Sequence, residues 1–384
     1  LFRQRNEKVS DKDYEPLSVT KLGIVPQLED AAKTNDGDNR KKVLKGDFVI
    51  NSRSDRKGSS GLSNLDGSVS LINIVLADGE PYPRYTHHLL RSYPFQEEFY
   101  RWGQGIVADL WSTNYQRMKV IQLPIPDNQT QKRIAGYLDK ETAKIDKLIT
   151  DQERLLELLG EKREAEIAWL VTKGTKNLNE TKNSGIDGIG DIPSHWDIVR
   201  TVVLFSENRL LNNNLETKNA LKYRFGEITS KELTSDFNFE ELRRYKLVKE
   251  NDIMVNGLNL NYDFVTQRVA LVGEAGCITP AYIALRPRDV IRPKYASLLL
   301  KSLDAQKVLN GWGTGIRLTL NFSEFKKTYL CLPPLNEQDD IIAACDDISQ
   351  KFEKLSLAIK RELELLKERR VSLISNVVTG KVKV

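Results

Sequence analysis

The sequence predicts an α+β protein in which one plan, an α/β domain followed by a long helix, occurs twice in tandem. Two observations lead to this prediction. A Trp-Gly-x-Gly-Ile core occurs at Trp102–Ile106 and again at Trp312–Ile316, 210 positions later. In each copy, short apolar runs between turn residues give way to a proline-free stretch rich in Glu, Lys, Leu and Ala. An internal duplication of this kind determines the architecture before any single element is assigned.

The repeat extends well beyond the tryptophans. PRYTHHLLRS at Pro83–Ser92 matches PKYASLLLKS at Pro293–Ser302, with five of ten positions identical. The other matching pairs are GDFVIN (46–51) with NDIMVN (251–256), LPIPDNQ (123–129) with LPPLNEQ (332–338), and LVTKG (170–174) with VVTGK (377–381). Leu1-Phe2 also lines up loosely with Leu204-Phe205, so the order is kept and the offset drifts only from 203 to 210. Such an ordered series indicates duplication rather than coincidence.

The second copy opens with an extra segment, DIPSHW at Asp191–Trp196. Its counterpart in the first copy would lie before Leu1, so we expect about twenty residues of that copy to be absent from this sequence. The predicted division of the chain is a first domain at 1–126, a first long helix at 127–173, a polar linker at 174–191, a second domain at 192–334 and a second long helix at 335–384.

The sequence pattern of each domain predicts short strands joined by turns. Apolar runs such as Phe48–Ile50, Leu71–Leu76 and Val269–Val272 lie between Gly, Asn and Asp residues, which are typical of turns. Each long stretch that follows has about 45 residues and would form a helix of about 65 Å.

A seven-residue apolar spacing predicts that the two helices pair. In the second helix it comprises Cys345, Phe352, Ile359, Leu366 and Leu373, with companions at Ile341, Ile348 and Leu355 until Glu362 and Arg369 break the line. In the first helix it comprises Leu148 and Leu155 with Ile145 and Leu159, interrupted by Gln152, Lys162 and Glu166. Such spacing is typical of a coiled coil. We expect the helices to pair antiparallel, with the domains at opposite ends and a pseudo-two-fold axis between the copies.

Composition excludes several classes of protein. The hydrophobic share of 40% and the charged share of 29% fit a folded protein with real cores. No apolar run approaches the ~18 residues of a membrane span, and the N-terminus has no signal-peptide core. Cys277, Cys331 and Cys345 are far apart in sequence, which favours a reducing cytoplasm. A net charge of +5 permits nucleic-acid binding without diagnosing it.

The sequence offers no convincing catalytic or metal site. Its three histidines do not cluster with Cys or Asp at metal-ligand spacing, and no phosphate-binding loop of the GxxxxGK[ST] type occurs. No Asp-Pro-Pro-Tyr-like segment for adenine methylation is present either. We therefore expect no cofactor and a role that is not catalytic.

Several segments together resemble the specificity subunit of type I restriction–modification enzymes. They are IPSHWDIVR (192–200), ITPAYIALRP (278–287), GWGTGIRLTLNFSEFK (311–326), LPPLNEQ (332–338) and SLISNVVTGKV (372–382). The resemblance covers nearly the whole chain. The first copy departs from it in having Gln-Thr-Gln for Glu-Gln and in lacking the arginine of GTGIR.

The resemblance implies a function for each part. Each domain would be a target recognition domain that reads one half of a split double-stranded DNA site. The helices would act as a spacer and dock two DNA-adenine methyltransferase subunits, with restriction (translocase) subunits as further partners of the complex.

Candidate DNA-contacting residues lie on loops rich in Gly, Ser and Asn. Base edges are read mainly by Arg, Lys, Asn and Gln. The loop 51–63 offers Asn51, Arg53, Arg56 and Lys57, and the corresponding loop 256–269 offers Asn256, Asn259, Asn261, Tyr262, Gln267 and Arg268. The two loops share almost no sequence, as two domains reading different half-sites would require, although any exposed loop can drift.

The repeated turn supplies Gln104 and Arg317 as further candidates. The alternative for this turn is structural, with Trp102 and Trp312 packed into the core. For the whole protein, two other functions stay open. One is a self-contained nuclease or methyltransferase, which the missing motifs disfavour. The other is a coiled-coil scaffold that joins two protein-binding domains and has no DNA role.

Overall fold

Two long helices are the largest elements of the fold, as predicted. They are α4 (Asn128–Lys173) and α9 (Leu335–Val378). Asp127 sets the start of α4, because its carboxylate accepts hydrogen bonds from the backbone N–H and the hydroxyl of Thr130. A glycine in the left-handed region follows each helix, Gly174 directly after α4 with φ of 80° and Gly380 two residues after α9 with φ of 74°.

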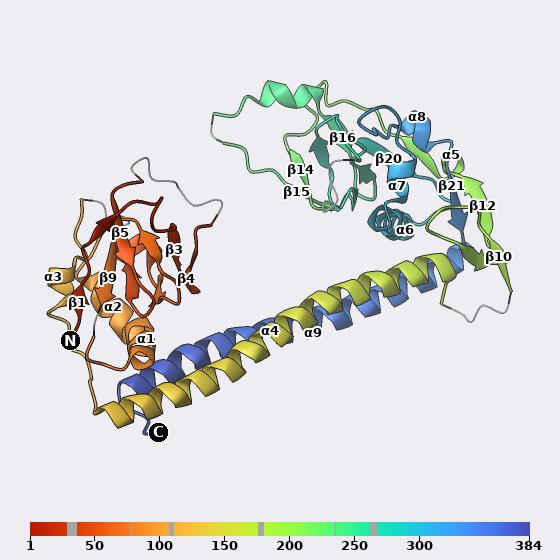
Figure 1. The fold of residues 1–384 in the computed structure, drawn as a ribbon. Helices are drawn as coiled ribbons and strands as arrows, with labels where there is room; N and C mark the ends of the chain where they lie inside the picture. The colour runs from red at the N-terminus through yellow and green to blue at the C-terminus, as the bar shows by residue number, and fades with distance from the viewer. Residues whose placement is uncertain (29–36, 78, 107–110, 176–179, 235, 262–266) are drawn as a thin grey trace. The chain divides into compact units, whose positions relative to one another are not determined.

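The chain divides into two units, each with its own hydrophobic core (Figure 1). Unit 1 comprises Leu1–Arg154 together with Ile359–Val384, and unit 2 comprises Leu155–Ala358. The structure, a computed structural model of the 384-residue chain, describes residues 1–28, 37–77, 79–106, 111–175, 180–234, 236–261 and 267–384. Each unit contains part of α4 and part of α9. The boundaries predicted for the two domains stay a prediction.

Short strands make up most of each unit, with helices following them. In unit 1 the elements are β1 (Arg3–Gln4), β2 (Lys8–Val9), β3 (Leu17–Thr20), β4 (Gly23–Pro26), β5 (Arg40–Val43), β6 (Phe48–Asn51), η1 (Ser54–Arg56), β7 (Ser60–Leu62), β8 (Gly67–Val69), β9 (Asn73–Ala77), α1 (Pro83–Arg91), α2 (Tyr93–Arg101) and α3 (Tyr115–Met118).

Unit 2 repeats this order after an opening of its own. Its elements are β10 (Thr181–Asn183), β11 (Asp191–Pro193), β12 (Asp197–Arg200), α5 (Thr201–Leu204), β13 (Phe205–Glu207), β14 (Leu221–Arg224), β15 (Glu227–Ser230), η3 (Phe239–Arg244), β16 (Lys246–Val248), β17 (Ile253–Val255), β18 (Val269–Leu271), β19 (Gly276–Ile278), β20 (Ile283–Pro287), α6 (Pro293–Ala305), α7 (Val308–Gly311), α8 (Phe322–Phe325) and β21 (Tyr329–Leu332).

The strand order confirms the duplication. The four-stranded sheet of unit 1 has the order β1-β9-β6-β7, and that of unit 2 has the order β13-β20-β17-β18. All neighbours in both sheets are antiparallel. Phe48 lies opposite Leu76 in unit 1, and Ile253 lies opposite Leu285 in unit 2. The register of the central pair of strands is therefore the same in both copies.

Each central strand is buried on both faces. Alternate side chains of a strand point to opposite faces. In β6, Phe48 and Ile50 pack with the helices, whereas Val49 packs with Val43 and Val69 of the neighbouring three-stranded sheet β2-β5-β8. The corresponding strand β17 divides its side chains between two cores in the same way. Each domain is thus a sheet between a helical layer and a second layer of strands.

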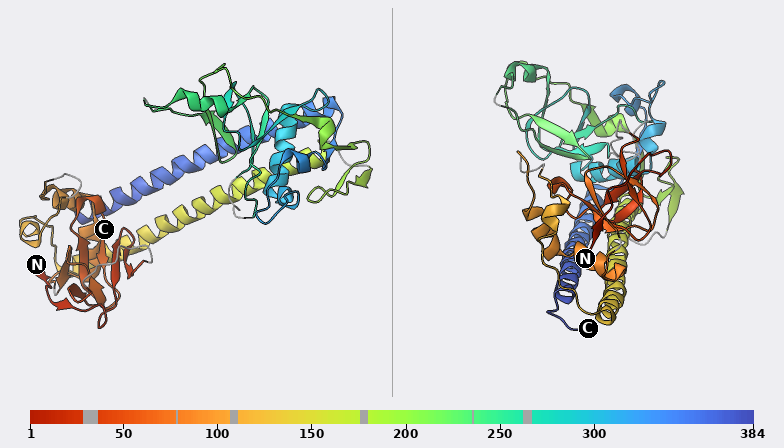
Figure 2. Two further views of the ribbon diagram at one scale, coloured as in Figure 1. Left: turned by 90° about the horizontal axis from the view of Figure 1, so that it is seen from above. Right: turned by 60° about the vertical axis from the view of Figure 1, so that its left-hand side comes forward.

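The two long helices close both cores. In unit 1, Ile134 and Leu138 of α4 join Ile374 and Val377 of α9 in one apolar cluster. The ion pairs Asp146–Arg370 and Glu153–Lys367 run in opposite order along the two helices, so the segments are antiparallel. Figure 2 shows these helix segments and the rest of unit 1 from two further sides.

A buried glutamine in the first turn of each long helix ties it to its domain. Gln131 accepts a hydrogen bond from the backbone N–H of Tyr82 at 2.7 Å and donates to the carbonyl of Pro126 at 2.7 Å. Gln338 accepts from the N–H of Arg292 at 2.7 Å and donates to the carbonyl of Pro333 at 2.8 Å. The sequence comparison had aligned Gln129 with Gln338, and this was wrong by two residues.

The predicted apolar seam is confirmed in part. Cys345, Phe352, Ile359 and Leu366 of α9 are buried as expected. Three predicted seam positions, Leu148 and Leu155 of α4 and Leu355 of α9, are instead exposed. Partly buried residues lie one position further along, at Ile149 and Leu156 of α4 and at Ser356 of α9, and Leu363, one position after Glu362, is buried. An α-helix has 3.6 residues per turn, so a strict seven-residue stripe drifts around it.

The predicted flexible linker is in part a hairpin. β10 pairs antiparallel with β11, with Thr181 opposite Pro193. Residues 176–179 of this linker lie outside the described residues. No helix in the described part of the chain combines the length and apolar character that crossing a membrane demands.

We predict that Gln338→Ala lowers the free energy of unfolding of unit 2 by about 2–4 kcal/mol, because the N–H of Arg292 loses its buried acceptor and a cavity forms. Urea unfolding followed by circular dichroism would measure this. Gln350→Ala, at an exposed position on the same helix, serves as the control and should change stability by less than about 0.5 kcal/mol. Equal effects of the two changes would contradict the role given to Gln338.

Candidate nucleic-acid interface

In each unit the loop after the central strand, β6 or β17, is hydrogen-bonded to the residue that directly follows the repeated Trp-Gly turn. The turn closes at Ser112 in unit 1 and at Thr319 in unit 2. The N–H of Thr113 donates to the carbonyl of Ser52 at 3.0 Å in unit 1. At the equivalent place in unit 2, the N–H of Leu320 donates to the carbonyl of Gly257 at 2.8 Å. A side chain at Gly257 would collide with the carbonyl oxygen of Leu320, so glycine is needed there. Two segments that the sequence singled out separately therefore form one surface in each unit.

The repeated turn is closed by a short antiparallel bridge. Gln104 pairs with Ser112 in unit 1, and Thr314 pairs with Thr319 in unit 2. The turn presents a fully exposed isoleucine in both units, Ile106 and Ile316. The sequence analysis includes both isoleucines in the repeated core, but it does not predict that they are exposed.

The two tryptophans of the turn differ in their surroundings. Trp312 packs edge-on against Phe325, with ring centroids 6.0 Å apart, as the structural alternative for this turn predicted. Trp102 is 39% exposed, and its ring N–H donates to Glu98 at 3.0 Å. The expectation that Trp102 packs into the core was therefore wrong.

Arginine and lysine side chains of the unit 1 loop are exposed but paired. Arg53 donates two hydrogen bonds to the carboxylate of Asp55, at 3.0 and 3.1 Å. Lys57 contacts Glu97 at 2.5 Å, and the Arg56 guanidinium lies 3.6 Å from Asp55. Exposed ion pairs of this kind contribute only about 0–1 kcal/mol. These cations can therefore change partners at little cost. Gln104 is exposed as well, with its backbone fixed by the bridge to Ser112.

Asn51 and Asn256 shape the two loops. The side-chain oxygen of Asn51 accepts a hydrogen bond from the N–H of Arg53 at 3.1 Å. That of Asn256 accepts from the N–H of Leu258 at 3.2 Å. Both asparagines are half-buried and form the same local turn, which is a common role for this side chain. Their side chains are committed to the loop backbone in this conformation.

The unit 2 loop presents a different set of side chains. Asn259 and Gln267 are exposed, and Asn259 has φ of 50°. Asn261 is half-buried and donates to the carbonyl of Ile316 at 3.4 Å. Arg317 is exposed at the repeated turn. Tyr262, also expected to contact DNA, lies outside the described residues.

Arg268 was expected to reach DNA, and the structure corrects this. Its side chain is 2% exposed and donates to three backbone carbonyls, those of Asn256, Leu258 and Asn259, at 2.7–3.2 Å. A buried guanidinium in this arrangement holds the loop together. The sequence could not show this, because an arginine near an exposed loop has the same local pattern whether it points in or out.

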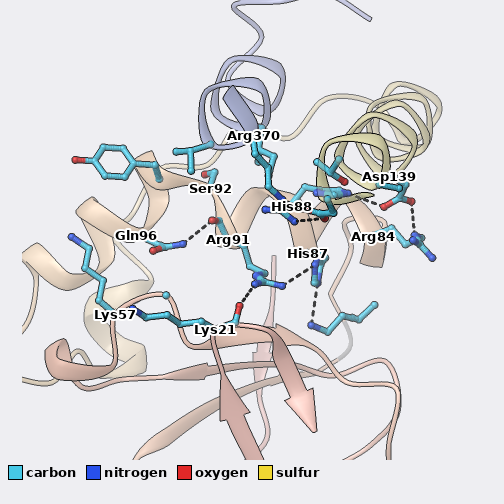
Figure 3. Close-up of a pocket in the computed structure, with 18 of the residues that line it drawn as sticks. Lys21, Lys57, Arg84, His87, His88, Arg91, Ser92, Gln96, Asp139 and Arg370 are labelled. Carbon is cyan, nitrogen blue, oxygen red and sulfur yellow. Dashed lines mark hydrogen bonds and ion pairs between the residues drawn. The ribbon is translucent and has the colours of Figure 1, made fainter. Parts of the chain in front are cut away.

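A cavity of about 590 Å³ lies beside this surface in unit 1, between the loop, α1 and the two long helices (Figure 3). Lys57 of the loop and Arg91 of α1 line it, together with Arg370 of α9. His87 also lines it and is neutral, because burial and then the nearby Arg91 lower its pKa to about 3. Among the described residues, no group of three or more His, Cys, Asp or Glu side chains is placed to hold a metal ion.

Comparison with known proteins identifies the fold. No protein-family model matches the chain, and no curated protein matches it. A solved structure described as the "Structural basis underlying complex assembly and conformational transition of the type I R-M system" contains a chain with a TM-score of 0.70 and 15% identity. The match covers 100% of this chain and 98% of that one.

A second match is the HsdS subunit from Thermoanaerobacter tengcongensis, with a TM-score of 0.54 and 17% identity, covering 100% of this chain and 94% of that chain. The protein described here therefore has the fold of the S subunits of type I restriction–modification systems.

We predict that Arg268→Leu lowers the free energy of unfolding of unit 2 by about 2 kcal/mol or more, because three backbone carbonyls lose their buried donor. Arg317→Ala, at an exposed position of the adjoining turn, should shift it by less than about 0.5 kcal/mol. Thermal unfolding of the two variants beside the unmodified protein would check both values. An Arg268 variant as stable as the Arg317 variant would show that Arg268 does not hold the loop.

Proposed function

We propose that the protein is the DNA sequence-specificity subunit of a type I restriction–modification complex. Each of the two recognition domains, 1–126 and 192–334, would bind one half of a bipartite, asymmetric DNA site. One observation supports this most strongly. The same loop-and-turn surface occurs in both units on an equivalent scaffold, yet it carries different side chains. Equivalent scaffolds with different reading residues are what two unlike half-sites require.

The exposed side chains are suited to reading base edges. Arg and Lys recognise guanine, and Asn and Gln recognise adenine, by hydrogen bonds in the major groove. In unit 1 the proposed readers are Arg53, Arg56, Lys57 and Gln104. In unit 2 they are Asn259, Asn261, Gln267 and Arg317, with Tyr262 kept from the sequence prediction. Asn51 and Asn256 would shape the loops instead, and Arg268 is no longer among the candidates.

The long helices are proposed to dock two methyltransferase subunits. Leucine is exposed at equivalent positions of both helices, Leu148 with Leu355 and Leu158 with Leu365. Each unit carries one leucine of each pair. Exposed apolar side chains that recur in this way are typical of interaction surfaces. Two equivalent surfaces would bind two copies of the same partner.

Catalysis would be supplied by the partners. Methylation would come from the methyltransferase subunits and cleavage from the restriction subunits, so the S subunit needs no cofactor of its own. The length of α4 and α9 would set the gap between the half-sites.

Co-expression of the chain with its cognate methyltransferase subunit, followed by mapping of methylated adenines on a plasmid, tests the proposal. We predict a two-part methylated motif with different halves and a constant gap. The methyltransferase should also co-purify with the chain, at two copies per chain by native mass spectrometry. Arg317→Ala should relax the motif in one half only.

Two results would count against the proposal. A continuous methylated motif would contradict the two-domain recognition. An associated, soluble complex without any methylation would favour the scaffold function, in which the two domains bind proteins instead of DNA.

A further inference from the structure

The cavity of unit 1 has a strongly cationic lining. Five Lys and Arg side chains face it, against two carboxylates. The cations are Lys21, Lys57, Arg84, Arg91 and Arg370, and the carboxylates are Asp139 and Asp146. In Figure 3, Arg370 reaches towards Arg91 from α9, while Lys21 and Lys57 face the space from the opposite wall. We call this space, with Arg91 and Arg370 at its centre, the cationic cleft.

Two arginines in the cleft are placed close together. Arg91 donates to the carbonyl of Lys21 at 2.5 Å and contacts His87 at 3.3 Å, and neither partner is an anion. Arg370 is held by the carboxylate of Asp146 at 2.6 and 3.1 Å. The pKa of Arg91 is lowered first by burial and then by the charge of Arg370, and the carboxylate of Asp146 offsets part of this. One carboxylate thus serves two half-buried cations, and a further anion beside Arg91 would reduce the remaining repulsion between them.

Unit 2 has cationic side chains at the two helix positions that correspond to Arg91 and Arg370. Arg91 is the ninth residue of α1, and Lys301 is the ninth residue of α6. Arg370 and Arg163 likewise occupy the same position of α9 and α4, 35 residues after Leu335 and after Asn128. Burial lowers the pKa of Lys301, the carboxylate of Glu227 partly offsets this, and the charge of Arg163 lowers the pKa further.

The framework around the two cation pairs is repeated as well. Arg84 of α1 pairs with Asp139 of α4 at 2.6 Å. Lys294 of α6 pairs with Asp346 of α9 at 2.6 Å, and these are the equivalent positions. The first helix after the sheet is thus attached to its long helix in the same way in both units. Lys301 and Arg163 therefore lie where the helix after the sheet meets the long helix, as Arg91 and Arg370 do in unit 1.

We propose that the cationic cleft of unit 1 binds a phosphate of the DNA backbone through Arg91 and Arg370, and that Lys301 and Arg163, at the equivalent helix positions of unit 2, bind a second phosphate. The proposal rests on the proposed function. Phosphates are the same at every base pair, whereas bases differ. A feature of constant charge in both units suits the constant part of DNA, and the loops, which differ, suit the bases.

The position of Lys57 favours DNA over other anions. It lines the cleft and also belongs to the loop that carries the proposed readers Arg53 and Arg56. The cleft is therefore continuous with the proposed DNA surface. Guanidinium groups also bind phosphate oxygens in pairs of parallel hydrogen bonds.

The test measures the salt dependence of binding to a mixed-sequence DNA duplex of about 60 base pairs, by the full chain in complex with its methyltransferase. Each lost phosphate contact should reduce the slope of log affinity against log salt by about 0.9. We expect the double variant R91Q/R370Q, and separately K301Q/R163Q, to remove one phosphate contact each and so to lower the slope by about 0.9. The methylated motif should stay unchanged, because phosphate contacts carry no sequence information.

A matched control removes the same charge elsewhere. Lys354 and Lys360 are exposed on α9, and K354Q/K360Q should leave the slope within error of the unmodified complex. The charge-retaining variant Arg91→Lys should keep the slope as well, which separates loss of charge from loss of fold. Thermal unfolding of every variant accompanies the binding data.

The outcomes distinguish this inference from the proposed function. Cleft variants that are folded and bind with the slope of the control would overturn the phosphate site while leaving DNA recognition intact. Cleft variants that lose the methyltransferase but keep the slope would also overturn it, and would assign the cleft to a protein carboxylate. An unmodified complex that does not bind the duplex even at low salt would contradict the proposed function itself.

Discussion

The fold depends on the buried glutamine in the first turn of each long helix. Gln131 links the residue before α1 to the proline segment that leads into α4, and Gln338 links the residue before α6 to the proline segment that leads into α9. This bridge fixes where the long helix leaves its domain. In unit 1 the end of the other long helix, at Ile374 and Val377, then completes the same core. Residues near both ends of the chain must therefore come together before unit 1 has a closed core, which makes its folding rely on distant contacts.

The same constraint explains how the two copies can share one scaffold while their loops carry different side chains. The sheet, the first domain helix and the long helices are fixed to one another by buried contacts, so they change little between the copies. The backbone of the loop after the central strand is fixed by hydrogen bonds to the Trp-Gly turn, by the side chains of Asn51 and Asn256, and within unit 2 by the buried guanidinium of Arg268. The rest of its surface is free to differ. A protein that must present two different surfaces in one geometry benefits from this separation.

Much of the architecture could be predicted from the sequence, because the motifs recur in order and proline is absent from both long helices. Finer features could not. The glutamine alignment failed because two extra residues precede Gln131 in its segment. Leu148 and Leu355 were assigned to the seam because a seven-residue count ignores helical drift. The cationic cleft draws on segments far apart in the chain, so no local pattern could reveal it.

The central claim is that two domains each hold one half of a DNA site. Hydroxyl-radical footprinting of the complex on DNA that carries the methylated motif tests this most directly. The account predicts two protected segments separated by an accessible gap, and Arg317→Ala should weaken protection of one segment while leaving the other unchanged. A single protected segment, or equal weakening of both segments by that one change, would contradict the account.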